Sequence, residues 1–300
     1  CLEMIEINKD PQVIDLEHTD PLIDLCFYPY AHDFFLTLPV TLQYQAFATL
    51  MIRQREDLQD NTETIGALQL LFDGGHCNDD MKLLLAEQFL LRDDPHQAQL
   101  IIEQVPVSAY RLSLFGWVHF LQDDAMAAIA CFEQSLVAKN KIARRVRQHV
   151  GDFPGVIYLL ALLQAGYESD VTLFNKLFAE VNNYKANQRS DKHFLKCYET
   201  LDGMGRLLSG KSKKLREIDF RYYHYDEDYY FRLAVLIGAL CFEWSREQPP
   251  EAYLERLADY CKAAKSSSSL WYARVAAKLL FSYNKRNLPA KNIITDDPGQ

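Results

Sequence analysis

The clearest chemical pattern in the sequence is G-x-x-x-x-G-K-S, formed by Gly205, Gly210, Lys211 and Ser212. In a phosphate-binding loop of this pattern, backbone N–H groups surround the phosphates, the lysine contacts the outer phosphates and the serine hydroxyl binds Mg²⁺. Such a loop joins a buried strand to a helix, whereas residues 194–204 have the apolar spacing of a helix. We therefore expect a helix C-terminus with Gly210 as its cap. A P-loop ATPase that uses Lys211 is the alternative.

Five basic residues within nine positions form a second candidate site. They are Lys139, Lys141, Arg144, Arg145 and Arg147. Clustered cations of this kind contact phosphates or acidic segments of a partner. The formal net charge of −9 argues against a protein whose whole surface binds nucleic acid. We expect a solvated loop between helical hairpins, with a weak nucleic-acid or partner contact as the alternative.

The remaining reactive side chains match no known type of site. The loop from Gly74 to Asp80 carries a histidine, a cysteine and acidic residues, but their spacing fits neither a zinc site nor a calcium loop. We expect a polar turn that ends in an N-cap aspartate. His119 is expected in the core, and the tyrosine-rich segment 222–231 is expected to pack under the next helix, with a partner-binding patch as the alternative. The sequence predicts no catalytic residue, cofactor or metal.

Helices must position these segments, because apolar residues recur at i, i+3, i+4 and i+7 from Thr41 onward. Hydrophobic residues make up 49% and charged residues 24% of the 300 residues, as in an ordinary globular protein. The longest apolar stretches, 156–163 and 233–242, are shorter than the roughly 18 residues of a membrane helix. Seven cysteines without a C-x-x-C pair favour reduced thiols in a cytoplasmic protein. We predict an all-α fold that does not enter a membrane.

Two helical hairpins between residues 80 and 140 are related by an offset of thirty positions. Ala86 aligns with Gly116, so a small residue recurs where two helices must approach closely. Ile102 aligns with Phe132, so a large residue recurs where the hairpin presses on its neighbour. A single hairpin cannot bury its apolar face alone, and stacked hairpins of this kind form tetratricopeptide-like arrays. The sequence thus predicts an α-solenoid of tetratricopeptide-like helical hairpins.

Capping residues and apolar stripes predict the ends and the buried faces of individual helices. Asp94 and Ser108 are expected as N-caps, and Gly166 is expected as a C-terminal cap. The stripes expected to face inward comprise Leu112, Phe115 and Gly116 in one helix, and Leu270, Ala273, Ala277, Leu280 and Phe281 in the last helix.

The chain divides into four segments. Residues 1–40 are expected as an irregular lead-in with short elements, and residues 41–150 as tetratricopeptide-like helical hairpins. Residues 151–284 are expected as further hairpins of the same solenoid, and residues 285–300 as a tail or a linker to a following domain. The chain begins with Cys1 and ends without closing an element, which favours an excerpt of a longer protein over a mature lipoprotein.

Four helical segments carry a resemblance to a known family: Leu83–Glu87, Ile129–Glu133 with the basic stretch after it, Phe153–Leu163 and Leu270–Leu280. Together they resemble the helical region that precedes the motor in large bacterial Swi/Snf-type helicase-like ATPases. The catalytic motifs of that family have no counterpart in this chain, so the resemblance carries over no catalytic residue. It implies a non-catalytic module attached to a DNA-translocating motor that lies outside this chain.

The first hypothesis is therefore a non-catalytic helical-repeat module for protein interaction or regulation. Its partner would be another protein or the motor domain of its own parent chain. A stand-alone tetratricopeptide-type adaptor is the second hypothesis, and a P-loop ATPase that uses Lys211 is the third. A parallel sheet would favour the ATPase, because a P-loop needs a strand before its first glycine.

Overall fold

The computed structural model describes residues 37–44, 46–47, 62–142, 148–186, 194–212, 229–246, 248–264 and 271–287. Within these residues every regular element is helical and none is a strand, which confirms the predicted all-α class. The first helices are α5 (Thr62–Asp73), α6 (Asp79–Leu91), α7 (Pro95–Ile102), α8 (Ala109–Leu121) and α9 (Ala125–Ile142). They are followed by α10 (Asp152–Glu168), α11 (Leu173–Ala186), α13 (Leu195–Leu208), α14 (Tyr229–Ser245), α15 (Glu251–Ala264) and α16 (Trp271–Asn287).

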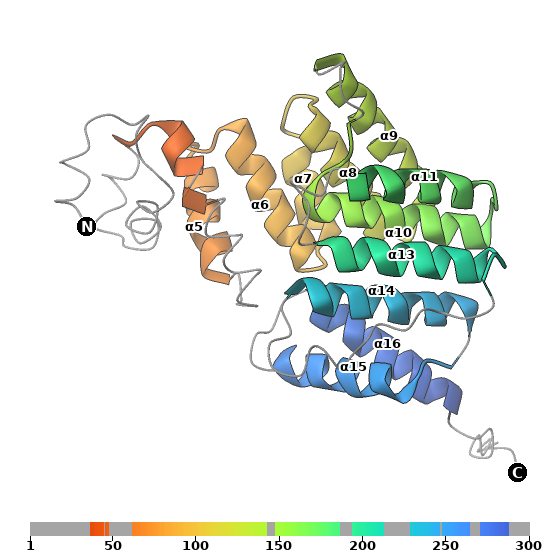
Figure 1. Ribbon diagram of the computed structural model, residues 1–300. Helices are drawn as coiled ribbons and strands as arrows, with labels where there is room; N and C mark the ends of the chain where they lie inside the picture. Colours follow the sequence, from red (N-terminus) through yellow and green to blue (C-terminus); the bar gives the residue numbers. More distant parts are fainter. Residues whose placement is uncertain are drawn as a thin grey trace, which may run out of the picture.

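The helices are arranged as a row with further helices packed against it (Figure 1). In the row, each helix contacts the next in the order α5, α6, α8, α10, α13, α14, α16. Helix α7 contacts α6 and α8, α9 contacts α8 and α10, and α11 contacts α10 and α13. Helix α15 packs on α14 and α16 at the C-terminal end of the row. Helices that follow one another in the described part of the chain therefore pack against each other.

Helix α10 lies at the centre of this arrangement and is buried nearly all round. It contacts α8, α9, α11, α13 and α14, which explains why its sequence has no polar face. Aromatic pairs join it to the preceding hairpin. The ring centres of Trp117 and Phe153 are 4.6 Å apart, and those of Phe132 and Tyr158 are 5.2 Å apart. Each such pair contributes about 0.5–1.5 kcal/mol beyond the area that it buries.

The thirty-residue offset is visible in the bounds of the helices. Helix α6 starts and ends thirty positions before α8, and α7 starts thirty positions before α9. The turns inside the two hairpins also match, because Asp93 and Asp123 have positive φ angles of 59° and 61°. The next residue in each turn, Asp94 or Asp124, donates its N–H to a carbonyl five residues back, at 2.9 Å in both hairpins. The predicted correspondence thus extends to the backbone conformation.

Side-chain caps repeat with the same offset. The Ser108 hydroxyl accepts a hydrogen bond at 3.1 Å from a backbone N–H three residues further on, and Asn78 accepts the equivalent bond at 2.8 Å. The carboxylates of Asp94 and Asp124 accept from equivalent N–H groups at 3.1 Å and 2.9 Å. These bonds satisfy N–H groups that have no partner within the helix. The predicted N-caps Asp94 and Ser108 are therefore confirmed.

Three predictions about helix faces and ends differ from the structure. In α8, Gly116 is buried as expected, but Leu112 and Phe115 are only half-buried, and Trp117 is fully buried instead. Gly166 does not end α10, which continues to Glu168. Gly166 is instead buried within α10, where a Cβ would make an ordinary contact with the ring of Phe174 in α11 at 3.4 Å.

The face predicted for α16 is wrong at two positions, whereas Leu280 is half-buried against the core and the side chains of Leu270 and Ala273 lie outside the described residues. Ala277 and Phe281 are exposed, and Phe281 retains 72% of its accessible surface. The buried residues of this helix are Val275, Ala276, Leu279 and Tyr283. Helix α16 carries two apolar stripes, and α14 and α15 pack against only one of them. Helix α16 also continues to Asn287, beyond the boundary predicted at residue 284. The lead-in up to residue 36 and the tail from residue 288 lie outside the described residues.

Candidate functional site

The P-loop-like pattern lies at the C-terminal end of α13. Gly205 is buried inside this helix, where a Cβ would lie 2.8 Å from Cδ2 of Leu177 in α11. Gly210 follows the last turn with a φ angle of +72°, and the Ser212 N–H donates to the Arg206 carbonyl at 2.9 Å. The predicted helix C-terminus, with Gly210 in a left-handed conformation after it, is confirmed. A helix thus occupies the position at which a phosphate loop requires a strand.

Lys211 lies against α11. Its Nζ donates a hydrogen bond to Oδ1 of Asn175 at 3.1 Å and lies 4.5 Å from the centre of the Phe178 ring. The Arg206 guanidinium lies 5.2 Å from the same ring, so one half-buried aromatic side chain makes cation–π contacts with two cations. Each contact of this kind contributes about 0.5–1 kcal/mol at an exposed site. The arrangement joins two different helices, so the spacing of either helix alone could not reveal it.

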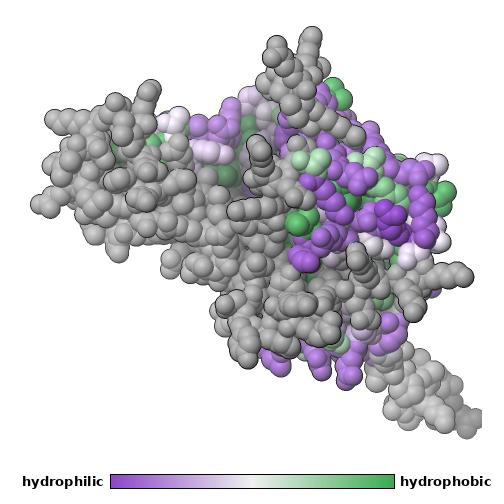
Figure 2. Space-filling model, in the orientation of Figure 1, coloured by the Kyte–Doolittle hydropathy of each residue, from purple (hydrophilic) through white to green (hydrophobic). Residues whose placement is uncertain are grey.

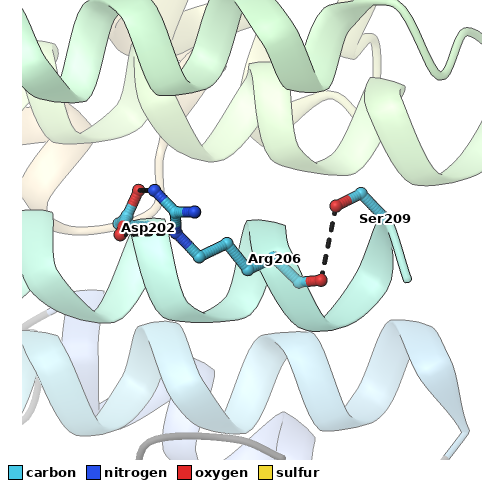
Figure 3. A network of polar contacts seen from close by, with 3 residues as sticks. All are labelled: Asp202, Arg206 and Ser209. Carbon is cyan, nitrogen blue, oxygen red and sulfur yellow. Dashed lines mark hydrogen bonds and ion pairs between the residues drawn. The ribbon is translucent and has the colours of Figure 1, made fainter. Parts of the chain in front are cut away.

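The charge of Arg206 is compensated within its own helix (Figure 3). Its Nε donates to Oδ2 of Asp202 at 3.0 Å, and its Nη2 donates to Oδ1 at 3.3 Å. The side-chain hydrogen bond to Asp202, together with the attraction of that carboxylate, raises the pKa of Arg206. The Ser209 hydroxyl donates to the Arg206 carbonyl at 3.3 Å and closes the last turn. The hydrogen-bond partner of Lys211, by contrast, is an uncharged amide.

The structure describes only one side chain of the basic cluster. Lys139, on α9, donates from Nζ to the carbonyl of His149 at 3.1 Å. The adjacent Gln148 carbonyl accepts from Asn183 of α11 at 3.4 Å. These bonds anchor the chain where the basic segment rejoins the described part of the molecule, between α9 and α11. The side chains of Lys141, Arg144, Arg145 and Arg147 lie outside the described residues.

The loop between α5 and α6 is a capping turn. The N-cap of α6 is Asn78 and not an aspartate as predicted, because Asn78 Oδ1 accepts from the Met81 N–H at 2.8 Å. Asp79 and Asp80 occupy the first turn, where carboxylates interact favourably with the helix dipole. Burial raises the pKa of the Cys77 thiol to about 11, so the thiolate that metals and electrophiles require is scarce at neutral pH. Within the described residues, no three His, Cys, Asp or Glu side chains gather as a metal site would require.

The sequence offers two other candidates, His119 and the tyrosine-rich segment 222–231. His119 is half-buried in the last turn of α8, where its carbonyl accepts the Asp124 N–H at 2.9 Å. The side chains of the tyrosine-rich segment 222–231 lie outside the described residues.

Comparison with known proteins gives no match to a family model, to a curated protein or to a solved structure. Among the described helices, none combines the length and the apolar character that crossing a membrane requires. Functional arguments must therefore start from the helix arrangement and from the surface that it exposes.

Proposed function

We propose that this chain is a non-catalytic helical-repeat module for protein interaction or regulation, built as an α-solenoid of tetratricopeptide-like hairpins. The observation that carries the proposal is the recurrence of the α6–α7 hairpin thirty residues later as α8–α9, with the same caps and the same turn. Repeats of this type stack to bury their apolar faces and present extended surfaces to partners. The cytoplasm is the compartment that fits its cysteine content.

The outer helices supply a surface that fits this role. Met126 and Val137 on α9 retain 52% and 55% of their accessible surface, and Leu100 on α7 retains 47%. Met126 and Val137 are eleven positions apart, which is close to three full turns, so they lie on one side of α9. Figure 2 shows one face of the molecule, on which hydrophobic residues lie in small groups among hydrophilic ones. Met126 and Val137 are thus two separate exposed apolar side chains on one side of an outer helix, and we assign the contact with a partner to this side.

The resemblance of the sequence supports one partner in particular, the motor domain of a bacterial Swi/Snf-type helicase-like parent chain. The basic segment between α9 and α10 supports a second, weaker contact with nucleic acid or with acidic groups. Its anchoring through Lys139 and Asn183 would hold such a contact at the end of α9, close in sequence to Val137. A stand-alone adaptor of the tetratricopeptide type would use the same surface for a separate protein.

Calorimetric titration of this chain into the motor domain of the parent protein tests the proposal. The double variant Met126→Asp, Val137→Asp should weaken binding by at least about tenfold, because two carboxylates would have to be desolvated at the interface. Leu70→Asp is the matched control. Leu70 is 67% exposed and lies on α5, which packs on α6 at the other end of the row.

Unchanged affinity in the double variant would refute the assignment of α9 as the binding surface, as would equal weakening by the control. A reading frame that encodes no motor domain after this chain would select the stand-alone adaptor. ATP hydrolysis that is lost in Lys211→Ala would instead establish the third hypothesis, the P-loop ATPase.

A further inference from the structure

An ion pair joins two residues that are 185 positions apart in the sequence. Asp93 lies in the turn between α6 and α7, and Lys278 lies in the middle of α16. The distance from Lys278 Nζ to Asp93 Oδ2 is 3.0 Å. Among the helix pairs with extensive contacts in the described part of the chain, α6 connects to α16 by way of α8, α10, α13 and α14. The ion pair therefore closes this path into a ring.

Both partners of the ion pair are held by their own surroundings. Asp93 has a φ angle of 59°, donates its N–H to the Leu90 carbonyl at 2.9 Å, and has a side chain that is only 15% exposed. Helix α16 is fixed on α14, because Ser282 Oγ donates to Glu243 Oε1 at 2.6 Å and the Tyr283 hydroxyl donates to the backbone of α14. Because the carboxylate and α16 are already ordered, only the Lys278 side chain loses much freedom when the pair forms.

The second hairpin offers an internal comparison for Asp93. Asp123 occupies the equivalent position, with a φ angle of 61° and the equivalent backbone hydrogen bond at 3.1 Å, but it is exposed. The hairpin turn alone therefore does not account for the burial of the Asp93 carboxylate. The difference between the two aspartates is that α16 reaches the turn of the first hairpin.

We propose that the Asp93–Lys278 ion pair is a salt-sensitive clasp that holds α16 against the turn of the first repeated hairpin. The Lys278 side chain is 72% exposed, so dissolved ions reach the pair and screen it. Exposed pairs of this kind contribute little to overall stability. The clasp therefore restrains the contact between α16 and the α6–α7 turn and does not hold the fold together. This inference is independent of which partner the outer helices bind.

Hydrogen–deuterium exchange followed by mass spectrometry tests the clasp. In low salt, Asp93→Asn and Lys278→Gln should each raise the exchange rate of amides in α16 and in the α6–α7 turn by about two- to fivefold. Asn tolerates the left-handed conformation, so the turn itself should survive the substitution. Asp123→Asn, at the equivalent position, should leave exchange in α16 unchanged. The double variant Asp93→Asn, Lys278→Gln should exchange no faster than either single variant, because both remove the same interaction.

Salt provides the second arm of this test. At about 1 M NaCl, where charges are screened over roughly 3 Å, the wild-type protein should exchange as fast as the variants. Equal effects of Asp93→Asn and Asp123→Asn would overturn the proposal. Additive effects in the double variant, or a difference from wild type that persists at high salt, would also overturn it.

Discussion

The hairpins α6–α7 and α8–α9 have equivalent caps and turns, but different residues fill their interiors. Their caps and turns are equivalent residue by residue. Inside, the first hairpin carries Ala86 and Ile102, whereas the second carries Gly116 and Phe132. A Cβ on Gly116 would lie 2.7 Å from the Phe132 ring, so the larger side chain fills the space that the smaller one leaves.

The caps and turns of the two hairpins thus recur residue by residue, while the sizes of the interior residues are exchanged between the two helices. Capping residues act through local hydrogen bonds that any hairpin of this length can form. Core positions accept different residues as long as the total volume is conserved. The repeat is therefore easier to recognise from its caps and turns than from its apolar residues.

The largest expected effect is at the interior pair of the second hairpin. Gly116→Ala should lower the free energy of unfolding by about 1–3 kcal/mol, because the new methyl group would overlap the Phe132 ring. The reverse change in the first hairpin, Ala86→Gly, should cost about 0.5–1 kcal/mol through helix propensity, with a further loss from the buried methyl group. Urea-induced unfolding followed by circular dichroism measures both changes.

The double variant Gly116→Ala, Phe132→Ile converts the interior of the second hairpin into that of the first. Removing the ring should relieve the overlap, so the double variant should be more stable than expected from the sum of the two single changes. If the free-energy changes of the two single variants simply add, the interiors of the two hairpins do not pack in the same way.

A smaller effect is expected at the two N-caps. Asn78→Ala and Ser108→Ala should each lower the free energy of unfolding by about 1 kcal/mol, since each leaves one backbone N–H at a helix start without its side-chain acceptor. Thermal unfolding of the two variants in the same buffer compares them directly. A loss at only one of the two positions would show that the hairpins are not equivalent.

The loops before the two hairpins differ in how far equivalent side chains are exposed. This difference leads to a prediction about the reactivity of Cys77. Val107 is 72% exposed, whereas its counterpart Cys77 is half-buried and donates from Sγ to the Leu68 carbonyl at 3.7 Å. Burial raises the pKa of Cys77 from 9.0 to about 11, which lowers the thiolate fraction at pH 8 by about one hundredfold. Alkylation of Cys77 by iodoacetamide at pH 8 should be slower in the folded protein than in the urea-unfolded chain, by about the same hundredfold factor.

The same shift fixes the sign of a pH effect on stability. Below pH 9 the thiol of Cys77 is protonated in both states, so it adds no pH dependence there. Between about pH 9 and 11 the unfolded chain releases the proton first, so stability should fall as the pH rises. Equal alkylation rates in the folded and unfolded chains would contradict the assigned burial of this side chain.

Local features of this molecule could be predicted from the sequence, whereas features that depend on distant neighbours could not. Asp94, Ser108 and Gly210 act on the backbone next to them, so their roles follow from the residues alone. The loop before α6 offers three adjacent capping residues, and sequence reasoning chose an aspartate where the structure uses Asn78.

The buried face of α16 and the surroundings of Lys211 depend on tertiary contacts. Ala277 and Phe281 form a plausible stripe, but α14 and α15 cover the opposite side of the helix. Phe178 and Asn175 meet Lys211 only because α11 packs on α13. The pairing of Asp93 with Lys278 likewise has no local signature, since it spans most of the chain.

Two calorimetric titrations of one preparation distinguish a chain that binds a protein from one that turns over a nucleotide. The proposed function requires saturable heat with the motor domain of the parent protein and none with Mg-ATP, in the wild-type chain and in Lys211→Ala alike. Binding of Mg-ATP that disappears in Lys211→Ala, together with no binding of the motor domain, would contradict it.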